Sequence, residues 1–283
     1  MALRFARTLS AAAFVLLPMT CWGQDTGAPK ARDQSDAHPD WSGYYRLATP
    51  RQLAGTNLKQ DSPGEQLNAL VTPHLQPWAK VRMEATDGVA EDPGQVCLPT
   101  GMFRYPVMAG IFTWLQEPGR ILFVFSNINT AGVKRVHMDR DHPKHLLPTW
   151  NGDAVGHWEK TTEGDTLVID TIGFNDKSWL FGGMQPHTEE AHLIERIRQV
   201  KDGLLEFTIT VEDRHALTSP YTYKRYFMKQ QGEMPEEICN EDPDTWREFR
   251  NAAIKRDQEK AAKQLEEAQR AKQVPKQVPQ QVQ

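Results

Sequence analysis

The stretch 187–196 is rich in side chains that exchange protons. Its candidate catalytic residues are His192, Glu195 and Arg196, because an imidazole beside a carboxylate and a guanidinium can move a proton near neutral pH. If the stretch is a β-strand, His192 and Arg196 share one face and Glu195 lies on the other. A ladder of ion pairs on an ordinary sheet face explains the same pattern, so both interpretations stay open.

A second charged stretch, residues 137–145, offers a different chemistry. Imidazoles and carboxylates suit zinc, copper or iron, and a metal hypothesis would use His137, Asp139, His142 and His145. The spacing of these residues matches no closed ligand set, which favours a charged loop between strands. We therefore predict no metal ligand, and we add His142 to the candidate catalytic residues.

Sequence motifs for common cofactors and nucleophiles are missing. The sequence contains no phosphate-binding glycine loop, no Cys-x-x-Cys and no His-Glu-x-x-His. It also has no Gly-x-Ser-x-Gly, which disfavours an acyl-enzyme hydrolase. We predict a protein without a cofactor.

The elements that position these residues are short strands. Strand patterns with turn residues between them are found at 41–47, 111–116, 120–126, 132–138, 152–159, 165–172, 204–213 and 221–228. The stretch 187–201 also fits a helix, but the tight turn at Asp202-Gly203 needs a partner strand before it, so we predict a strand. A short helix is expected over 72–86 and a long charged helix over 243–272. Regular short strands predict a mainly β fold, a single antiparallel barrel or sandwich.

The chain divides into five expected regions. Residues 1–23 have a basic start, an apolar run at 9–17 and a break at Pro18, which predicts a signal peptide cleaved near Gly23 and a periplasmic or secreted protein. A lipoprotein anchored through Cys21 is the less favoured alternative. The remaining expected regions are a flexible leader at 24–39, a β-rich domain at 40–240, a charged helix at 241–273 and a disordered tail at 274–283.

The charge of the expected mature chain restricts its partners. Without residues 1–23 it has 31 basic and 37 acidic residues, a net charge of −6. This balance argues against nucleic acid or an anionic membrane as the main partner. No later apolar run has the length of a membrane span, so no membrane insertion is expected after cleavage. A small molecule is the expected partner.

Two cysteines remain in the expected mature chain, Cys97 and Cys239. An oxidising compartment favours a disulfide between them. Closing so long a loop would contribute on the order of 5 kcal/mol to the free energy of unfolding if the bridge is unstrained. Two buried free thiols are the alternative.

Five segments carry a resemblance to a known group of proteins. They are Cys-Leu-Pro at 97–99, Asp-Arg-Asp-His-Pro at 139–143, Pro-Thr-Trp-Asn-Gly-Asp-Ala-Val-Gly-His-Trp-Glu at 148–159, Gly-Asp-Thr-Leu at 164–167 and His-Thr-Glu-Glu-Ala-His-Leu-Ile-Glu-Arg at 187–196. Over residues 97–240 the sequence resembles a large group of exported bacterial proteins for which no reaction is established. It departs from the group before Arg140, where a glycine is missing, at Ala154, where serine is usual, and at 160–163, where a turn is longer.

The resemblance implies a lipocalin-like barrel with a cavity for one small, partly apolar molecule. The residues expected to line the cavity are Phe123, Phe125, Trp150, Trp158, Trp179 and His187. In the leading hypothesis the protein binds this molecule, and His142, His192, Glu195 and Arg196 orient it. The alternative is a cofactor-free isomerase, lyase or hydratase that uses the same residues for acid–base chemistry in the same cavity.

Overall fold

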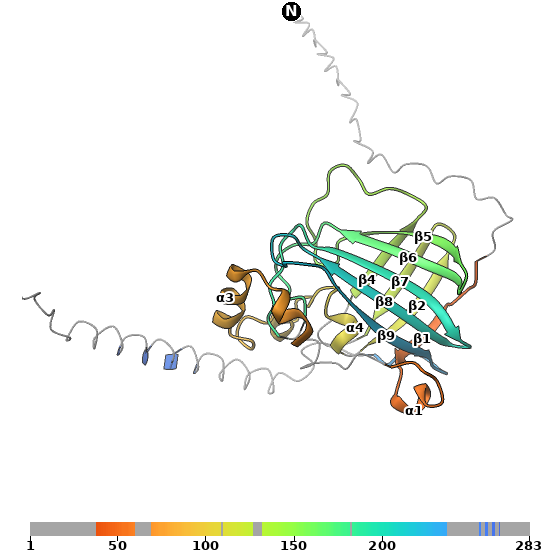
Figure 1. Ribbon diagram of the computed structural model, residues 1–283, viewed down its shortest axis with the longest axis horizontal. Coiled ribbons are helices and arrows are strands. Elements are labelled where there is room, and N and C mark those ends of the chain that lie inside the picture. The colour runs from red at the N-terminus through yellow and green to blue at the C-terminus, as the bar shows by residue number, and fades with distance from the viewer. Residues whose placement is uncertain are drawn as a thin grey trace, which may run out of the picture.

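The computed structural model describes residues 38–59, 69–108, 110–126, 132–181 and 183–236, with six isolated positions between 255 and 266. Nine strands of the described chain form a closed barrel, and their order around the wall follows their order in the sequence (Figure 1). The predicted mainly β fold is confirmed, and the barrel is preferred over the sandwich. The signal peptide, most of the leader and the body of the C-terminal helix lie outside the described residues and stay predictions.

The strands match the sequence pattern closely. They are β1 (Gly43–Leu47), β2 (Ile111–Glu117), β3 (Arg120–Phe125), β4 (Gly132–Met138), β5 (Asp153–Thr161), β6 (Gly164–Ile172), β7 (His192–Lys201), β8 (Leu204–Glu212) and β9 (Tyr221–Lys229). The prediction was wrong at the start of β7, which begins at His192 instead of residue 187. The Asp213 carboxylate accepts hydrogen bonds from the backbone N–H and the hydroxyl of Thr188, which holds this part of the chain in a turn.

One strand pair departs from the antiparallel expectation. All neighbours around the barrel are antiparallel except β4 and β5, which run parallel. A barrel with an odd number of strands cannot close with antiparallel pairs alone, so one parallel pair is required. A parallel pair needs a crossover instead of a hairpin, and residues 139–152 supply it. Asp139 starts the crossover with a left-handed backbone (φ 57°), a conformation that aspartate tolerates better than most residues.

Short helices lie at the two ends of the barrel. They are α1 (Pro50–Leu53), η1 (Thr72–His74), α3 (Pro77–Ala85), η2 (Pro93–Val96) and α4 (Tyr105–Met108). The predicted helix at 72–86 is confirmed as η1 and α3. Leu53 of α1 packs near the β7–β8 turn, whereas Gln76, just before α3, donates to the Ala216 carbonyl in the β8–β9 connection. Figure 1 shows the resulting separation of α1 and α3.

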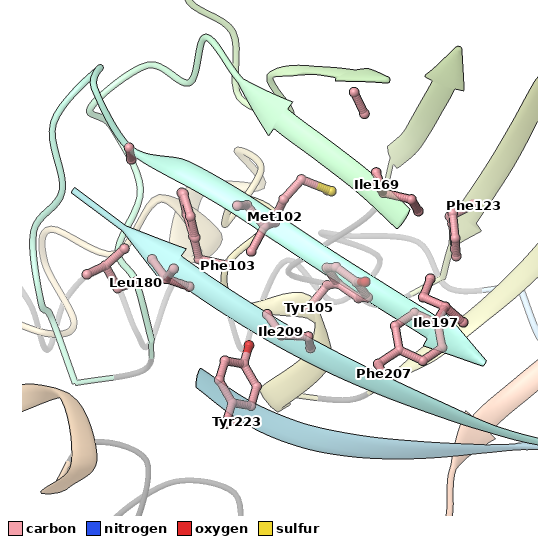
Figure 2. Packing of buried hydrophobic residues seen from close by; sticks show 14 of the residues in the cluster. Met102, Phe103, Tyr105, Phe123, Ile169, Leu180, Ile197, Phe207, Ile209 and Tyr223 are labelled. Atoms are coloured by element: carbon pink, nitrogen blue, oxygen red, sulfur yellow. The ribbon is translucent and has the colours of Figure 1, made fainter. Parts of the chain in front are cut away.

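The barrel interior is a packed core. Phe112 of β2 contacts Phe207 of β8, with ring centroids 6.0 Å apart, so aromatic rings connect distant walls. Phe123 and Phe125 belong to this cluster and are almost fully buried. At the α3 end, Tyr105 of α4 enters the same core, and Figure 2 shows it in the cluster with Ile169, Ile197 and Ile209. Aromatic packing of this kind makes the wall rigid.

None of the helices formed by the described residues has the length and apolar character needed to cross a membrane.

Candidate functional site

Asp170 is the centre of a polar cluster on the outer face of the barrel. It lies on β6 opposite Val155 of β5 and Ile194 of β7. Its Oδ1 atom is 3.0 Å from Nε2 of His142 and 2.9 Å from Nε2 of His192. Two of the four predicted catalytic residues therefore meet at one carboxylate oxygen.

The crossover between β4 and β5 brings His142 to this place. Because the crossover ends at the first residue of β5, His142 lies beside Asp153, and Nδ1 of His142 is 2.7 Å from Oδ2 of Asp153. The other Asp153 oxygen accepts a hydrogen bond from Arg140 at 2.7 Å. Arg140 also donates to the Asp141 carbonyl at 2.9 Å, so the charged loop is held against the sheet.

His192 is positioned by strand pairing. It lies directly opposite Glu212 of β8, and its Nδ1 atom is 3.4 Å from Oε2 of Glu212. Each imidazole in the cluster thus has a carboxylate near both nitrogens. We call this cluster the outer-wall relay, and its members are Arg140, His142, Asp153, Asp170, His192 and Glu212.

The relay shifts the acid–base properties of its members. The Asp170 carboxylate at hydrogen-bonding distance outweighs partial burial and raises the pKa of His192 above its usual value. Burial alone would raise the pKa of Asp170, but the contacts to His192 and His142 lower it. When both imidazoles are protonated, the six members carry three positive and three negative charges. His192 is therefore suited to gain and lose a proton close to neutral pH.

A surface pocket of about 370 Å³ adjoins the relay. It is lined by Gln76, Glu190, His192, Glu212, Asp213, Arg214, Leu217, Thr218, Ser219 and Pro220. His192 and Glu212 belong to both the pocket and the relay. Asp213 fixes the pocket wall, because it also accepts hydrogen bonds from the backbone N–H groups of His215 and Ala216. Arg214 and Glu190 form an exposed ion pair at 3.2 Å.

Glu195 and Arg196, the other two predicted catalytic residues, are not in this cluster. Glu195 points into the barrel and is fully buried, where it accepts a hydrogen bond from Tyr105 at 2.5 Å and pairs with the ammonium group of Lys134. Arg196 lies on the outer face and pairs with Glu159 at 2.6 Å. The expectation of one shared cavity is corrected, because strand alternation separates these neighbours.

The residues expected to line the cavity are dispersed. Trp158 packs with Trp41 at 4.9 Å, and Trp150 is half-buried in the crossover. Trp179 and His187 are buried in the β6–β7 connection, where His187 is 2.9 Å from the Ser178 hydroxyl. Burial lowers the pKa of His187. With Phe123 and Phe125 in the aromatic core, these six residues do not surround one space.

The metal hypothesis gains no support. Among the described residues, no three or more His, Cys, Asp or Glu side chains are arranged to hold a metal ion. His142 is engaged with Asp153 and Asp170, whereas burial lowers the pKa of His137. Cys97 follows η2 with a left-handed backbone (φ 58°), and Cys239 lies outside the described residues. The disulfide stays a prediction, which the intact mass before and after reduction would test.

Three important residues were not selected from the sequence. Asp170 interrupts the apolar run of β6, and that interruption was a usable signal. Lys134 has the same alternation parity as the buried Val136 and Met138, which indicated an inward direction. Tyr105 gave no signal, because its contact with Glu195 joins residues 90 positions apart.

Comparison of the chain with protein-family models, with curated proteins and with solved structures finds no match.

Proposed function

We propose that the protein binds a small polar molecule in the pocket beside His192 and exchanges a proton with it. The observation that supports this most strongly is the contact of both imidazoles with Asp170, with a further carboxylate at the other nitrogen of each. Ordinary surface ion pairs are isolated and flexible, whereas this arrangement fixes the orientation of His192 at the edge of a pocket.

The relay gives each nitrogen of His192 a different role. Asp170 at 2.9 Å holds the proton on Nε2, so the neutral imidazole has its lone pair on Nδ1. Nδ1 is near Glu212, a pocket residue, at the longer distance of 3.4 Å. Nδ1 is therefore the atom that accepts a proton from the bound molecule and returns it. Isomerisation, elimination and hydration all require such a step.

The remaining members of the relay act through Asp170. The pair formed by Asp153 and Arg140 holds His142, and His142 holds the Asp170 carboxylate toward His192. This arrangement keeps the pKa of His192 raised and so keeps its protonated form accessible near neutral pH. We also propose that the reaction takes place outside the cytoplasm, a proposal supported by the basic and apolar pattern of residues 1–23.

A ligand-observed NMR screen in D₂O tests the proposal and does not require the substrate to be identified beforehand. Wild-type protein and the His192→Gln, Asp170→Asn and His157→Gln variants are mixed with a panel of polar metabolites. Saturation transfer reports binding, and loss of C–H signals or appearance of new signals reports proton exchange and turnover. His157 is the matched control, because it is an outer-face histidine with a single carboxylate contact, Glu159 at 3.2 Å.

We expect at least one compound to react with the wild type and the His157→Gln variant at similar rates. The rate should fall by about 10²-fold or more in His192→Gln, as expected for loss of a general base. Binding that depends on His192 without any chemical change would reduce the proposal to a carrier function. Binding or turnover indifferent to His192 would reject the site.

A further inference from the structure

A separate group of polar side chains lies inside the barrel at the end covered by α4 and the β6–β7 connection. Tyr221 and Tyr223 of β9 and Thr171 of β6 are inward-facing and almost fully buried. Their hydroxyl groups have no hydrogen-bond partner in the part of the chain that the structure describes. The great majority of buried polar groups are paired, so three unpaired hydroxyls in one region need an explanation.

The two tyrosines occupy one place in the interior. They are two residues apart on β9, their rings are stacked with centroids 6.4 Å apart, and both rings contact Phe181. Figure 2 shows Tyr223 in the same buried cluster as Ile209 and Leu180. A phenylalanine would fill the same volume without an unpaired hydroxyl, so packing alone does not account for tyrosine at both positions.

The surroundings determine what these hydroxyls can bind. Burial raises the pKa of Tyr221 and Tyr223, so both phenols stay protonated and can donate. The negative charge of Glu195 also acts on Tyr223 and disfavours an anion beside it. The neighbouring Leu180 and Val211 are fully buried and apolar. A neutral oxygen acceptor on an apolar body fits both conditions.

We propose that Tyr221 and Tyr223 bind the carbonyl oxygen of a small, neutral, partly apolar molecule inside the barrel. This site is distinct from the pocket beside His192, which is on the outer face, and either site can exist without the other. The Lys134–Glu195 pair and Tyr105 form the polar boundary of the interior site, and Thr171 offers a third hydroxyl from the β6 wall.

Ligand-observed NMR of the full chain with acetone, cyclopentanone, cyclohexanone and acetophenone tests this proposal. The variants are Tyr221→Phe and Tyr223→Phe, and Tyr45→Phe is the matched control, because the buried Tyr45 hydroxyl already donates to the Trp41 carbonyl at 2.8 Å. We expect at least one ketone to bind the wild type and Tyr45→Phe equally. Its affinity should fall by at least tenfold in Tyr221→Phe or Tyr223→Phe. Methylcyclohexane, which lacks the oxygen, should bind at least tenfold more weakly than cyclohexanone.

A stability measurement without ligand makes the test independent of the choice of ketone. Tyr221→Phe and Tyr223→Phe should unfold at the same or a higher denaturant concentration than the wild type, whereas Tyr45→Phe should unfold at a lower one. If the first two variants lose as much as Tyr45→Phe, the hydroxyls have partners already, for example internal waters, and the proposal is wrong. Failure of all four ketones, or binding indifferent to both tyrosines, also overturns it.

Discussion

The inner and outer walls of the barrel hold their charged residues in opposite ways. On the inner wall, Glu195 and Lys134 are removed from water and pair with each other, with Tyr105 as a third partner. On the outer wall, Asp170 and the two histidines of the relay remain between one fifth and two fifths exposed. A buried pair has lost its hydration and depends on its partner, whereas an exposed group can exchange protons with solvent.

This contrast separates stability from chemistry. Glu195 connects β7 to β4 and α4, elements that are 61 and 90 positions away in the sequence, so its loss should affect the whole fold. The relay joins the crossover to β6, β7 and β8 at the surface, and its members have shifted pKa values that matter near neutral pH. Variants of the inner wall should therefore change stability, and variants of the outer wall should change titration.

The largest effect is expected for Glu195→Ala. The substitution leaves the buried Lys134 ammonium without its carboxylate, which should lower the free energy of unfolding by about 3–5 kcal/mol. Urea denaturation measures the loss. The double variant Lys134→Met/Glu195→Met removes both charges and should recover most of the stability. A loss below about 1 kcal/mol for Glu195→Ala would mean that the pair is hydrated and that the contrast between the walls is wrong.

Tyr105→Phe should have the next largest effect. It removes a hydrogen bond to a buried carboxylate, and bonds to charged groups contribute about 1.5–3 kcal/mol. The comparison is Tyr45→Phe, which removes a bond to the neutral Trp41 carbonyl worth about 0.5–1.5 kcal/mol. Chemical denaturation of both variants should give the order Tyr105→Phe, then Tyr45→Phe. The reverse order would show that Glu195 does not carry its charge in the folded protein.

A smaller, pH-dependent effect is expected at the relay. The pKa of His192 is raised above its ordinary value of 6.5, so its contribution to stability is complete below that pH and is lost as the pH rises through the folded pKa. The pKa of Asp170 is lowered from 3.8, so its contribution is present above that value and is lost as the pH falls through the folded pKa. Exposed pairs of this kind contribute at most about 1 kcal/mol.

Asp170→Asn should remove this pH dependence. NMR titration should show the pKa of His192 returning toward its ordinary value, and the decrease in stability above pH 6.5 should become shallower. His157→Gln should leave both quantities unchanged, because His157 is 56% exposed and contacts only Glu159 among the described carboxylates. An unchanged titration of His192 in Asp170→Asn would remove Asp170 from the proposed mechanism.

Local sequence patterns predicted the strands but not the sites. Apolar and polar residues alternate within each strand, so strand positions and the opposite faces of Glu195 and Arg196 could be derived without knowing the neighbours. The meeting of His142, Asp170 and His192 depends on the parallel β4–β5 pair and on the register of β6 with β7. These pairings are set by closure of the whole barrel, which no short stretch of sequence contains.

The filled interior was missed for a related reason. Phe123 and Phe125 have the composition of a cavity wall, but whether aromatic rings surround a ligand or one another depends on which strand lies across the barrel. Phe207 contacts Phe123 with ring centroids 6.5 Å apart, and Tyr105 contacts Phe125 at 4.6 Å. Both contacts join residues that are far apart in the sequence, so the pattern of β3 alone could not distinguish core from cavity.

The smallest effect is expected for Arg196→Gln. Arg196 is next to Glu195 in the chain, but its ion pair with Glu159 is about 40% exposed on both sides, so its loss should lower the free energy of unfolding by about 0.5 kcal/mol or less. The hydrogen bond from Arg196 is the largest cause of the lowered pKa of Glu159, so NMR titration should show that pKa rising in the variant. A loss comparable to that of Glu195→Ala would place Arg196 in a buried network. In that case strand alternation would no longer explain why two adjacent charged residues differ in their effect on stability.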